Sequence, residues 1–116
     1  MKQVRIFHNP HCSKSRQTLA LLQQNKLDIE VIEYLQTPPS EAELEQILTA
    51  LNLEPRELMR HDEPEYQALA LADLALNRSQ LIAAMVAHPL LIQRPIVTCG
   101  NKVALGRPPE QVLGIL

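Results

Sequence analysis

Hydrophobic and polar residues alternate over two short stretches near the start of the chain. The first stretch covers residues 4–8, and the second is the β-branched segment 29–35. Alternation of this kind predicts β-strands. Between the two stretches, residues 13–25 carry three leucines with the spacing of a helix. A strand, a helix and a strand within about 30 residues form a βαβ unit, so we expect the two strands to be parallel.

The middle of the chain has helical patterns that begin at polar caps or at prolines. Apolar residues recur at helical spacing over 41–51, directly after the capping-box pattern Ser40-Glu41-Ala42-Glu43. Pro55 and Pro64 each suit the first turn of a short helix. We expect the Leu- and Ala-rich segment 69–76 to continue the second of these helices and to lie in the core.

A further helix and a hairpin complete the pattern. Residues 77–80 form another N-terminal box, and the helix after it should end at His88-Pro89. The apolar segments 96–99 and 102–105 flank Gly100-Asn101, a two-residue turn that favours a β-hairpin. The tail, 108–116, has proline in the first turn of a last helix.

The order βαβ, several helices, then ββα predicts an α/β fold of the thioredoxin type. Four strands should form a small mixed sheet, with a helical insertion at about residues 40–88. With 116 residues and no linker or internal repeat, residues 1–116 are expected to form a single domain.

Composition excludes several classes of partner. The net charge is −2 and only three residues are aromatic, which argues against a nucleic-acid partner. Because the sequence shows neither an apolar run of membrane-spanning length nor a signal peptide, we expect a cytoplasmic protein without a membrane partner. His8, His11 and Cys12 are close in sequence, but no second cluster completes a zinc site, so no metal is expected.

The stretch His8-Asn9-Pro10-His11-Cys12 links the first strand to the first helix and carries the most distinctive chemistry. Backbone N–H groups and the helix dipole at such a turn favour negative charge, and they lower the pKa of a thiol. A buried, inert cysteine is the alternative, but the neighbours of Cys12 are polar. We therefore interpret Cys12 as a nucleophile.

Several motifs in the same order as in a known family support this interpretation. They are His8-Asn9-Pro10-His11-Cys12 with Ser15-Arg16-Gln17-Thr18-Leu19, Glu57-Leu58-Met59-Arg60, the run from His88 to Val97 that contains Arg94-Pro95-Ile96-Val97, and Gly106-Arg107-Pro108. The sequence resembles the arsenate reductase family that couples to glutathione and glutaredoxin. It is also similar to Spx-type regulators, which bind RNA polymerase. Those regulators commonly have a Cys-x-x-Cys pair, whereas Ser15 takes the second position here.

The resemblance implies a cysteine nucleophile and three arginines that hold an arsenate-like oxyanion. Carried over by motif, these residues are Cys12, Arg60, Arg94 and Arg107. Arginine suits this task because its planar guanidinium binds an oxyanion through two donors. The resemblance also implies a cis peptide bond between Arg94 and Pro95.

Three further residues are candidates for stabilising the thiolate. Ser15 cannot resolve a disulfide, so we expect it to donate a hydrogen bond to the thiolate or to the bound anion. His8 could assist as a cation or as a donor, or it could be a structural histidine. Arg16 could lower the pKa of the thiol or pair with an acidic residue. Cys99 fits a strand position better than a resolving thiol.

The function implied is the reduction of arsenate to arsenite through a Cys12 adduct. Glutathione would be the co-substrate and glutaredoxin the partner that reduces the resulting disulfide, with no bound cofactor and with the chain as a monomer. Two alternatives stay open. One is a thiol-dependent reductase of another oxidant, and the other is an Spx-like protein that binds the transcription machinery.

Overall fold

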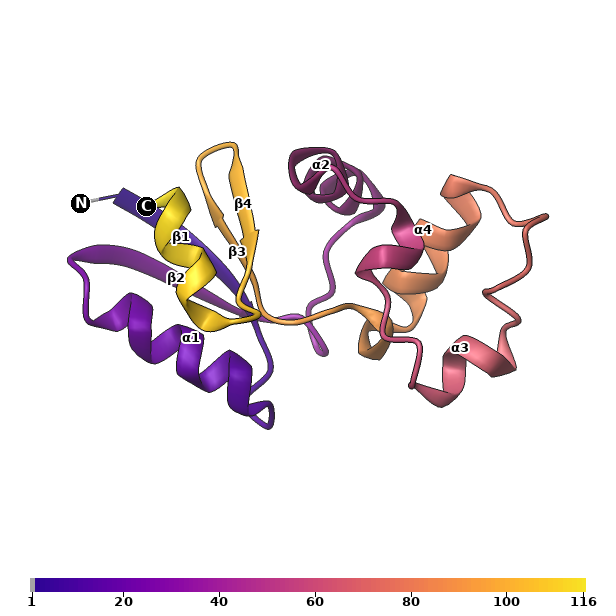
Figure 1. Cartoon of the computed structure of the whole chain (residues 1–116), viewed down its shortest axis with the longest axis horizontal. Helices are drawn as coiled ribbons and strands as arrows, with labels where there is room; N and C mark the ends of the chain where they lie inside the picture. The colour runs from indigo at the N-terminus through magenta and orange to yellow at the C-terminus, as the bar shows by residue number, and fades with distance from the viewer. Residues whose placement is uncertain (1) are drawn as a thin grey trace. The chain divides into compact units, whose positions relative to one another are not determined.

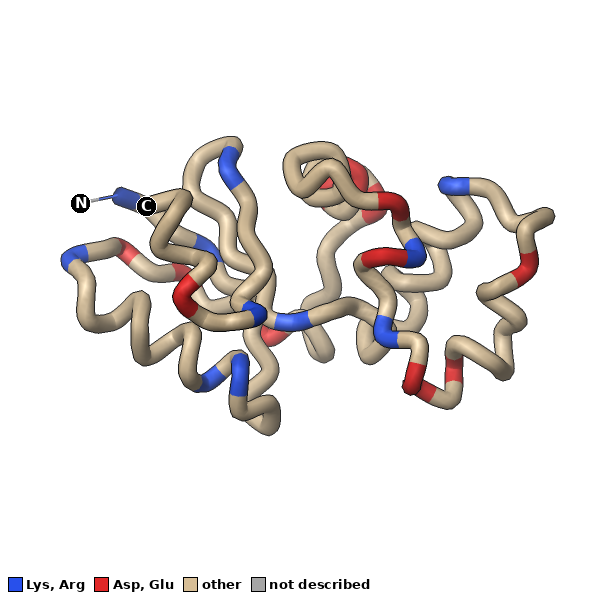
Figure 2. The backbone as a smooth tube through the Cα atoms, viewed as in Figure 1, with Lys and Arg blue, Asp and Glu red and all other residues tan. Residues whose placement is uncertain are grey.

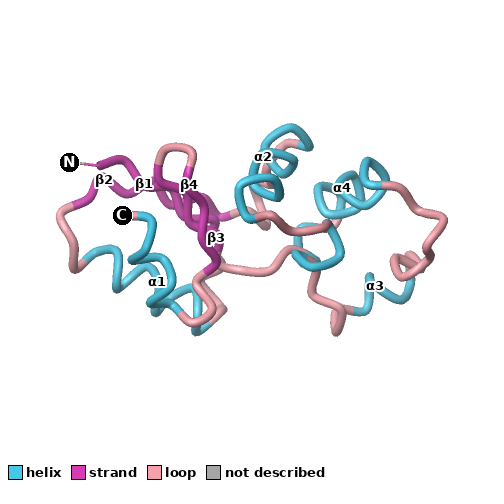
Figure 3. Tube along the Cα trace, turned by 45° about the horizontal axis from the view of Figure 1, so that its top comes forward, coloured by secondary structure: helices cyan, strands magenta, loops and turns pink. Residues whose placement is uncertain are grey.

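The chain folds into two compact units in the computed structural model, which describes residues 2–116. The first unit contains the described residues up to Thr37 together with Arg94–Leu116, and the second contains Pro38–Gln93. Every named strand in residues 2–116 belongs to the first unit, whereas helices and loops form the second (Figure 3). The helices expected at about residues 40–88 all lie in the second unit.

A four-stranded mixed sheet forms the centre of the first unit (Figure 1). In chain order its elements are β1 (Lys2–His8), α1 (Ser13–Gln23), β2 (Leu27–Glu33), β3 (Ile96–Cys99), β4 (Lys102–Leu105) and the 3₁₀ helix η3 (Pro109–Ile115). The strand order is β2-β1-β3-β4, with β1 parallel to β2 and antiparallel to β3. This arrangement confirms the predicted α/β fold, the parallel βαβ unit and the C-terminal hairpin.

One face of the sheet carries the core of the first unit. Val4 and Ile6 are two residues apart on β1 and therefore point to the same face, where they pack with Val97 of β3. Leu22 of α1 and Val112 of η3 complete this buried cluster. Because α1 is packed on the sheet in this way, its first turn lies at the carboxyl end of β1.

The second unit consists of short helices whose starts follow the predicted caps. They are α2 (Glu41–Leu51), the 3₁₀ helix η1 (Pro55–Leu58), α3 (Pro64–Ala68), α4 (Arg78–Ala87) and the 3₁₀ helix η2 (Pro89–Leu91). The Ser40 hydroxyl accepts a hydrogen bond from the Glu43 N–H at 3.1 Å. Asn77 and Gln80 form a reciprocal capping box at the start of α4. The polar residues read as caps in the sequence thus begin these helices as expected.

The segment after α3 differs from the prediction. It was expected to continue as a core helix over residues 69–76, but α3 ends at Ala68 and turns follow. Ala70 has a φ of 51°, in the left-handed region, which interrupts a right-handed helix. Leu71 is buried, whereas Leu69 is 41% exposed and Leu74 is 90% exposed. The expected core helix is therefore wrong for most of this segment.

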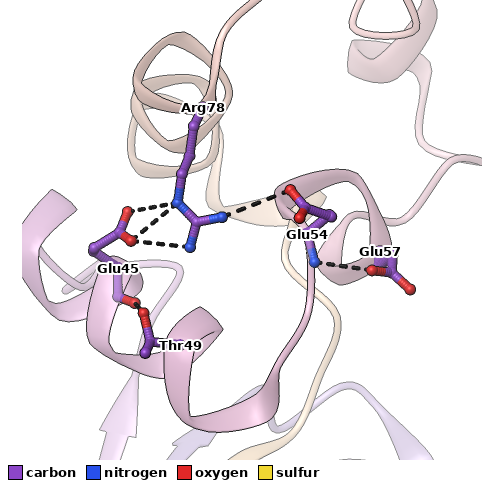
Figure 4. A network of polar contacts seen from close by, with 5 residues as sticks. All are labelled: Glu45, Thr49, Glu54, Glu57 and Arg78. Atoms are coloured by element: carbon purple, nitrogen blue, oxygen red, sulfur yellow. Dashed lines mark hydrogen bonds and ion pairs between the residues drawn. The ribbon is translucent and has the colours of Figure 1, made fainter.

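Within the second unit, the Arg78 guanidinium joins three elements (Figure 4). Its Nε lies 3.0 and 2.9 Å from the two carboxylate oxygens of Glu45 on α2, and its Nη1 lies 3.7 Å from Glu54 before η1. Hydrogen bonding from Arg78 lowers the pKa of the Glu45 carboxyl. The network is solvent-exposed, so salt screens it and its contribution to stability is small.

Replacing Arg78 by methionine should lower the melting temperature only slightly, by no more than about 4 °C. Arg78→Lys keeps the charge but loses the two-pronged geometry, so its melting temperature should lie between those of Arg78→Met and the wild type. Thermal melts at low salt and in 1 M NaCl measure both effects. Since the interaction is electrostatic, the difference in melting temperature between the variants and the wild type should be smaller in 1 M NaCl. A difference that grows with salt would contradict this account.

Acidic and basic residues occur in both units (Figure 2). No helix within residues 2–116 is both long enough and apolar enough to cross a membrane.

Candidate active site

Cys12 lies at the junction between β1 and α1, where the chain leaves the sheet and enters the helix. It is the N-cap residue of α1, with extended backbone angles of φ −100° and ψ 123°, and it is partly exposed. Asn9, which is buried, shapes the loop before it. The Asn9 carbonyl accepts the Cys12 N–H at 3.0 Å, and the Asn9 side-chain oxygen accepts the His11 N–H at 2.9 Å. The loop therefore holds the thiol at the N-terminus of the helix.

The surroundings of Cys12 lower the pKa of its thiol. Partial burial acts in the opposite direction and would raise this pKa. The backbone N–H of Ser15, the guanidinium of Arg94 and the backbone N–H of Lys14 outweigh burial because they stabilise the negative sulfur. The arrangement favours a thiolate at a helix N-terminus.

The Ser15 hydroxyl takes a different role from the one expected. It is fully buried, accepts the Asn9 N–H at 3.0 Å and lies 2.6 Å from His8 Nδ1. Its backbone N–H, and not its hydroxyl, stabilises Cys12. The expectation that the hydroxyl serves the thiolate or the anion is therefore replaced by a structural role. The hydroxyl ties the end of β1 to the first turn of α1.

The contacts of His8 fit the structural alternative better than a cation or a donor to the thiolate. Burial lowers the pKa of its imidazole, with an opposing effect from Glu33 and a smaller lowering from Arg16. The ring is therefore neutral near pH 7. In the tautomer with its proton on Nε2, a neutral His8 accepts a hydrogen bond from the Ser15 hydroxyl at Nδ1, while the Ser15 oxygen accepts one from the Asn9 N–H.

Arg16 spans the loop. Its Nη1 donates to the Pro10 carbonyl at 2.9 Å, and its side chain is exposed. The sequence left open whether it acts on the thiol or pairs with an acidic residue. The hydrogen bond seen here is a third role, in which Arg16 holds the loop against the first turns of α1.

Arg94 lies just before β3 and its guanidinium acts directly on Cys12. Burial would lower the pKa of Arg94, but Cys12 and Tyr34 raise it above its ordinary value. Its Nε and Nη1 are buried, and neither has a hydrogen-bond partner within residues 2–116. Buried donors without acceptors are costly. Two such donors beside a thiolate form a site that an oxyanion would complete.

Tyr34 is a residue of this site that the sequence reasoning missed. It is buried, and its phenol helps to raise the pKa of the Arg94 guanidinium. A signal was available, because Tyr34 directly follows β2 and β2 runs parallel to β1. Parallel strands end at the same edge of a sheet, so residues after β1 and after β2 emerge together.

The side chain of Arg107 is hydrogen-bonded to the backbone of Arg94. Its Nε donates to the Arg94 carbonyl at 2.7 Å, and its side chain is exposed. The Arg94–Pro95 peptide bond is cis, as predicted, and the Arg107–Pro108 bond is cis as well, which was not predicted. Two arginines 13 residues apart in sequence thus come together.

Arg60, the third candidate arginine, belongs to the second unit. Its Nη1 lies 2.9 Å from a carboxylate oxygen of Glu63, and its Nη2 lies 3.9 Å from Asp62. Its backbone N–H donates to the Leu91 carbonyl at 2.6 Å. The structure thus groups Cys12, His8, Ser15, Arg16, Arg94 and Arg107 in the first unit. The role of Arg60 in anion binding stays a prediction.

Cys99 is far from Cys12 along the sheet. It follows Thr98, which pairs with Arg5 near the start of β1, whereas Cys12 lies in the loop beyond His8, the last residue of β1. The position of Cys99 along the sheet is four residues of extended strand from the end of β1, a distance of about 13 Å. Cys99 is therefore not placed to form a disulfide with Cys12. Within residues 2–116, no three His, Cys, Asp or Glu side chains form a group that could hold a metal ion.

Comparison with known proteins gives consistent matches over almost the whole chain. The model of the ArsC family matches residues 7–115. The protein YfgD of Escherichia coli K12, which is uncharacterized, is 52% identical over 99% of this chain and 98% of its own. An arsenate reductase of Haemophilus influenzae is 46% identical over 96% of this chain and 97% of its own. The structure of an arsenate reductase from Vibrio cholerae matches with a TM-score of 0.95 and 51% identity, over 99% of this chain and 98% of that one.

Proposed function

The chain belongs to the ArsC family, and we propose that it reduces arsenate to arsenite with Cys12 as the nucleophile and with glutathione and glutaredoxin as electron donors. One observation carries the proposal. Two buried N–H donors of Arg94 lack a partner within the described chain, and they lie beside a thiol whose pKa is lowered. A thiolate alone would repel an oxyanion, whereas a thiolate beside unpaired guanidinium donors can receive one.

Several groups of the first unit would bind the arsenate together. Arg94 offers its unpaired donors to the arsenate oxygens, and the exposed Arg107 is tied to the Arg94 backbone at 2.7 Å and adds a second positive charge. The N–H groups of the first turn of α1 contribute a further positive potential. Together these groups offset the negative charge of the substrate as the sulfur approaches it.

The proposed reaction has three steps. The Cys12 thiolate attacks arsenic(V) and an S–As bond forms, while an As–O bond breaks and the arsenate hydroxyl takes up a proton from the solvent and leaves as water. A glutathione thiolate then attacks the Cys12 sulfur, and the S–As electron pair passes to arsenic. Arsenic thereby leaves as arsenic(III), while Cys12 and glutathione are oxidised to a mixed disulfide. A glutaredoxin thiolate finally attacks the glutathione sulfur and releases Cys12 as thiolate.

The need for an external thiol follows from the positions of the other residues. Ser15 occupies the place from which a Cys-x-x-Cys motif would resolve the disulfide, and its hydroxyl is engaged with His8 and Asn9. Cys99 lies at the other end of the sheet. Neither residue can reduce a Cys12 adduct within the same unit.

Alkylation by iodoacetamide tests the site without requiring turnover. Cys12 should react with an apparent pKa below about 8.5, the ordinary thiol value, because Ser15, Arg94 and Lys14 stabilise its thiolate. Arsenate should slow the reaction, since it would occupy the space in front of the sulfur. Peptide mass spectrometry separates Cys12 from Cys99, which serves as the internal control. An ordinary titration of Cys12 and no protection by arsenate would refute the proposed site.

A further inference from the structure

Gly106 lies at a close approach between α1, whose N-cap is Cys12, and the segments that carry Arg94 and Arg107. It is buried, and a Cβ built on it would overlap Thr18 Oγ1, lie 2.7 Å from Pro95 Cγ and lie 3.1 Å from Thr18 Cγ2. Thr18 belongs to α1, and Pro95 follows Arg94. A residue with any side chain would therefore force these three segments apart.

Neither neighbour of Gly106 can move aside easily. Thr18 is fully buried, and its hydroxyl donates to the Lys14 carbonyl at 2.8 Å, which fixes its side-chain rotamer. Pro95 is a buried ring with little freedom of its own. The strain from an added methyl group at position 106 would consequently fall on the backbone of the 105–108 segment.

That backbone is connected directly to Arg94 and Arg107, the two candidate anion-binding arginines of the first unit. The Gly106 N–H donates to the Pro95 carbonyl at 2.9 Å, and Arg107, the next residue, donates through Nε to the Arg94 carbonyl at 2.7 Å. A displacement at Gly106 would therefore be transmitted to Arg107 through the chain and to Arg94 through these two hydrogen bonds.

We propose that Gly106, packed against Thr18 and Pro95, is a positioning residue that sets where Arg94 and Arg107 lie relative to Cys12. Its missing side chain allows α1 and the arginine segments to meet closely. The inference rests on the proposed function for its consequence on arsenate. The geometric relation between Gly106 and the thiol, however, can be measured without turnover.

Gly106→Ala should weaken the effect of Arg94 on Cys12. We expect the apparent pKa of Cys12 in iodoacetamide alkylation to rise by about half a unit or more. At pH values below the pKa, a rise of half a unit makes the thiolate fraction about threefold smaller. The limiting rate at high pH should not change, because the thiol stays accessible. Protection by arsenate should require a higher arsenate concentration. A merely structural role would lower the melting temperature without moving this pKa.

Two variants and a matched control make the test specific. Thr18→Ala in the Gly106→Ala background removes Thr18 Oγ1 and Thr18 Cγ2, two of the three atoms that lie close to the added methyl group. This double variant should bring the Cys12 pKa back toward the wild-type value. Thr18→Val replaces the hydroxyl nearest to Gly106 by a larger methyl group and should shift the pKa in the same direction as Gly106→Ala, by less. Gly114→Ala is the control, because nothing lies within 4 Å of a Cβ built there.

The outcomes separate this inference from the proposed function. A folded Gly106→Ala protein with the wild-type Cys12 pKa, or a double variant no closer to wild type than Gly106→Ala, would overturn the inference even if the protein reduces arsenate. If Gly106→Ala does not fold, an unchanged pKa in Thr18→Val would overturn it. Conversely, the expected shifts in a protein without arsenate turnover would support the positioning role and refute the proposed function.

Discussion

Cys12→Ser should abolish the formation of arsenite in the presence of arsenate, glutathione and glutaredoxin. A serine hydroxyl at this position is not ionised near neutral pH, and it cannot form the S–As bond or the mixed disulfide that the proposed steps require. Arsenite formation, measured over time with the purified protein, should therefore fall to the background of the glutathione and glutaredoxin mixture.

Cys99→Ser is the matched control for this variant. It removes the second thiol of the chain, which lies at the opposite end of the sheet, and it should leave arsenite formation at the wild-type rate. If Cys12→Ser retained turnover, or if Cys99→Ser lost it, the assignment of the nucleophile would be wrong.

Arg94→Lys should have the second largest effect, a loss of about 10²- to 10³-fold in kcat/KM for arsenate. Lysine keeps the positive charge but lacks the fork of donors, two of which are buried and unpaired within the described chain. The variant should also raise the apparent pKa of Cys12, since hydrogen bonding from Arg94 and its charge both lower that pKa. Turnover at neutral pH therefore falls for two reasons, and part of the loss should be recovered at higher pH.

Arg5→Lys provides the comparison for Arg94→Lys. Arg5 belongs to the same unit and is ion-paired with Glu30 on the neighbouring strand at 3.1 Å. It should show wild-type turnover and a wild-type alkylation profile. An Arg94→Lys protein that binds arsenate and titrates like the wild type would contradict the proposed site.

The sheet could be predicted from the sequence because its signals are local. Alternation on β1 and β2, the helix between them and the turn at Gly100-Asn101 each depend on neighbouring residues, and Gly100 indeed has a φ of 62°. The starts of α2 and α4 were predictable for the same reason, since the caps lie within three residues of the groups they bind.

Other features depend on contacts between distant residues and could not be predicted from pattern alone. Helical spacing of leucines suggested a core helix after α3, but the left-handed Ala70 ends that regularity. The Ser15 hydroxyl is hydrogen-bonded to His8 and Asn9 in the folded loop. Sequence spacing shows neither of these contacts.

The candidate site likewise has features that local sequence signals predict and features that depend on contacts between distant residues. The thiol at a helix N-terminus follows from the order of strand, cysteine and helix, and family motifs pointed to the arginines. The link from Arg107 to the Arg94 carbonyl, the interaction of Tyr34 with Arg94 and the tight packing at Gly106 arise only when β3 pairs with β1 and β4 pairs with β3. These contacts surround Arg94, the arginine that acts on the Cys12 sulfur.

Steady-state formation of arsenite by the wild-type protein tests the central claim most directly. The assay would contain arsenate, glutathione and a glutaredoxin, and each component would be left out in turn. We predict turnover that requires all three, that saturates with arsenate and that is lost in Cys12→Ser. Arsenite formation at the background rate, by a protein whose Cys12 reacts readily with iodoacetamide, would contradict the account and would point to another oxidant.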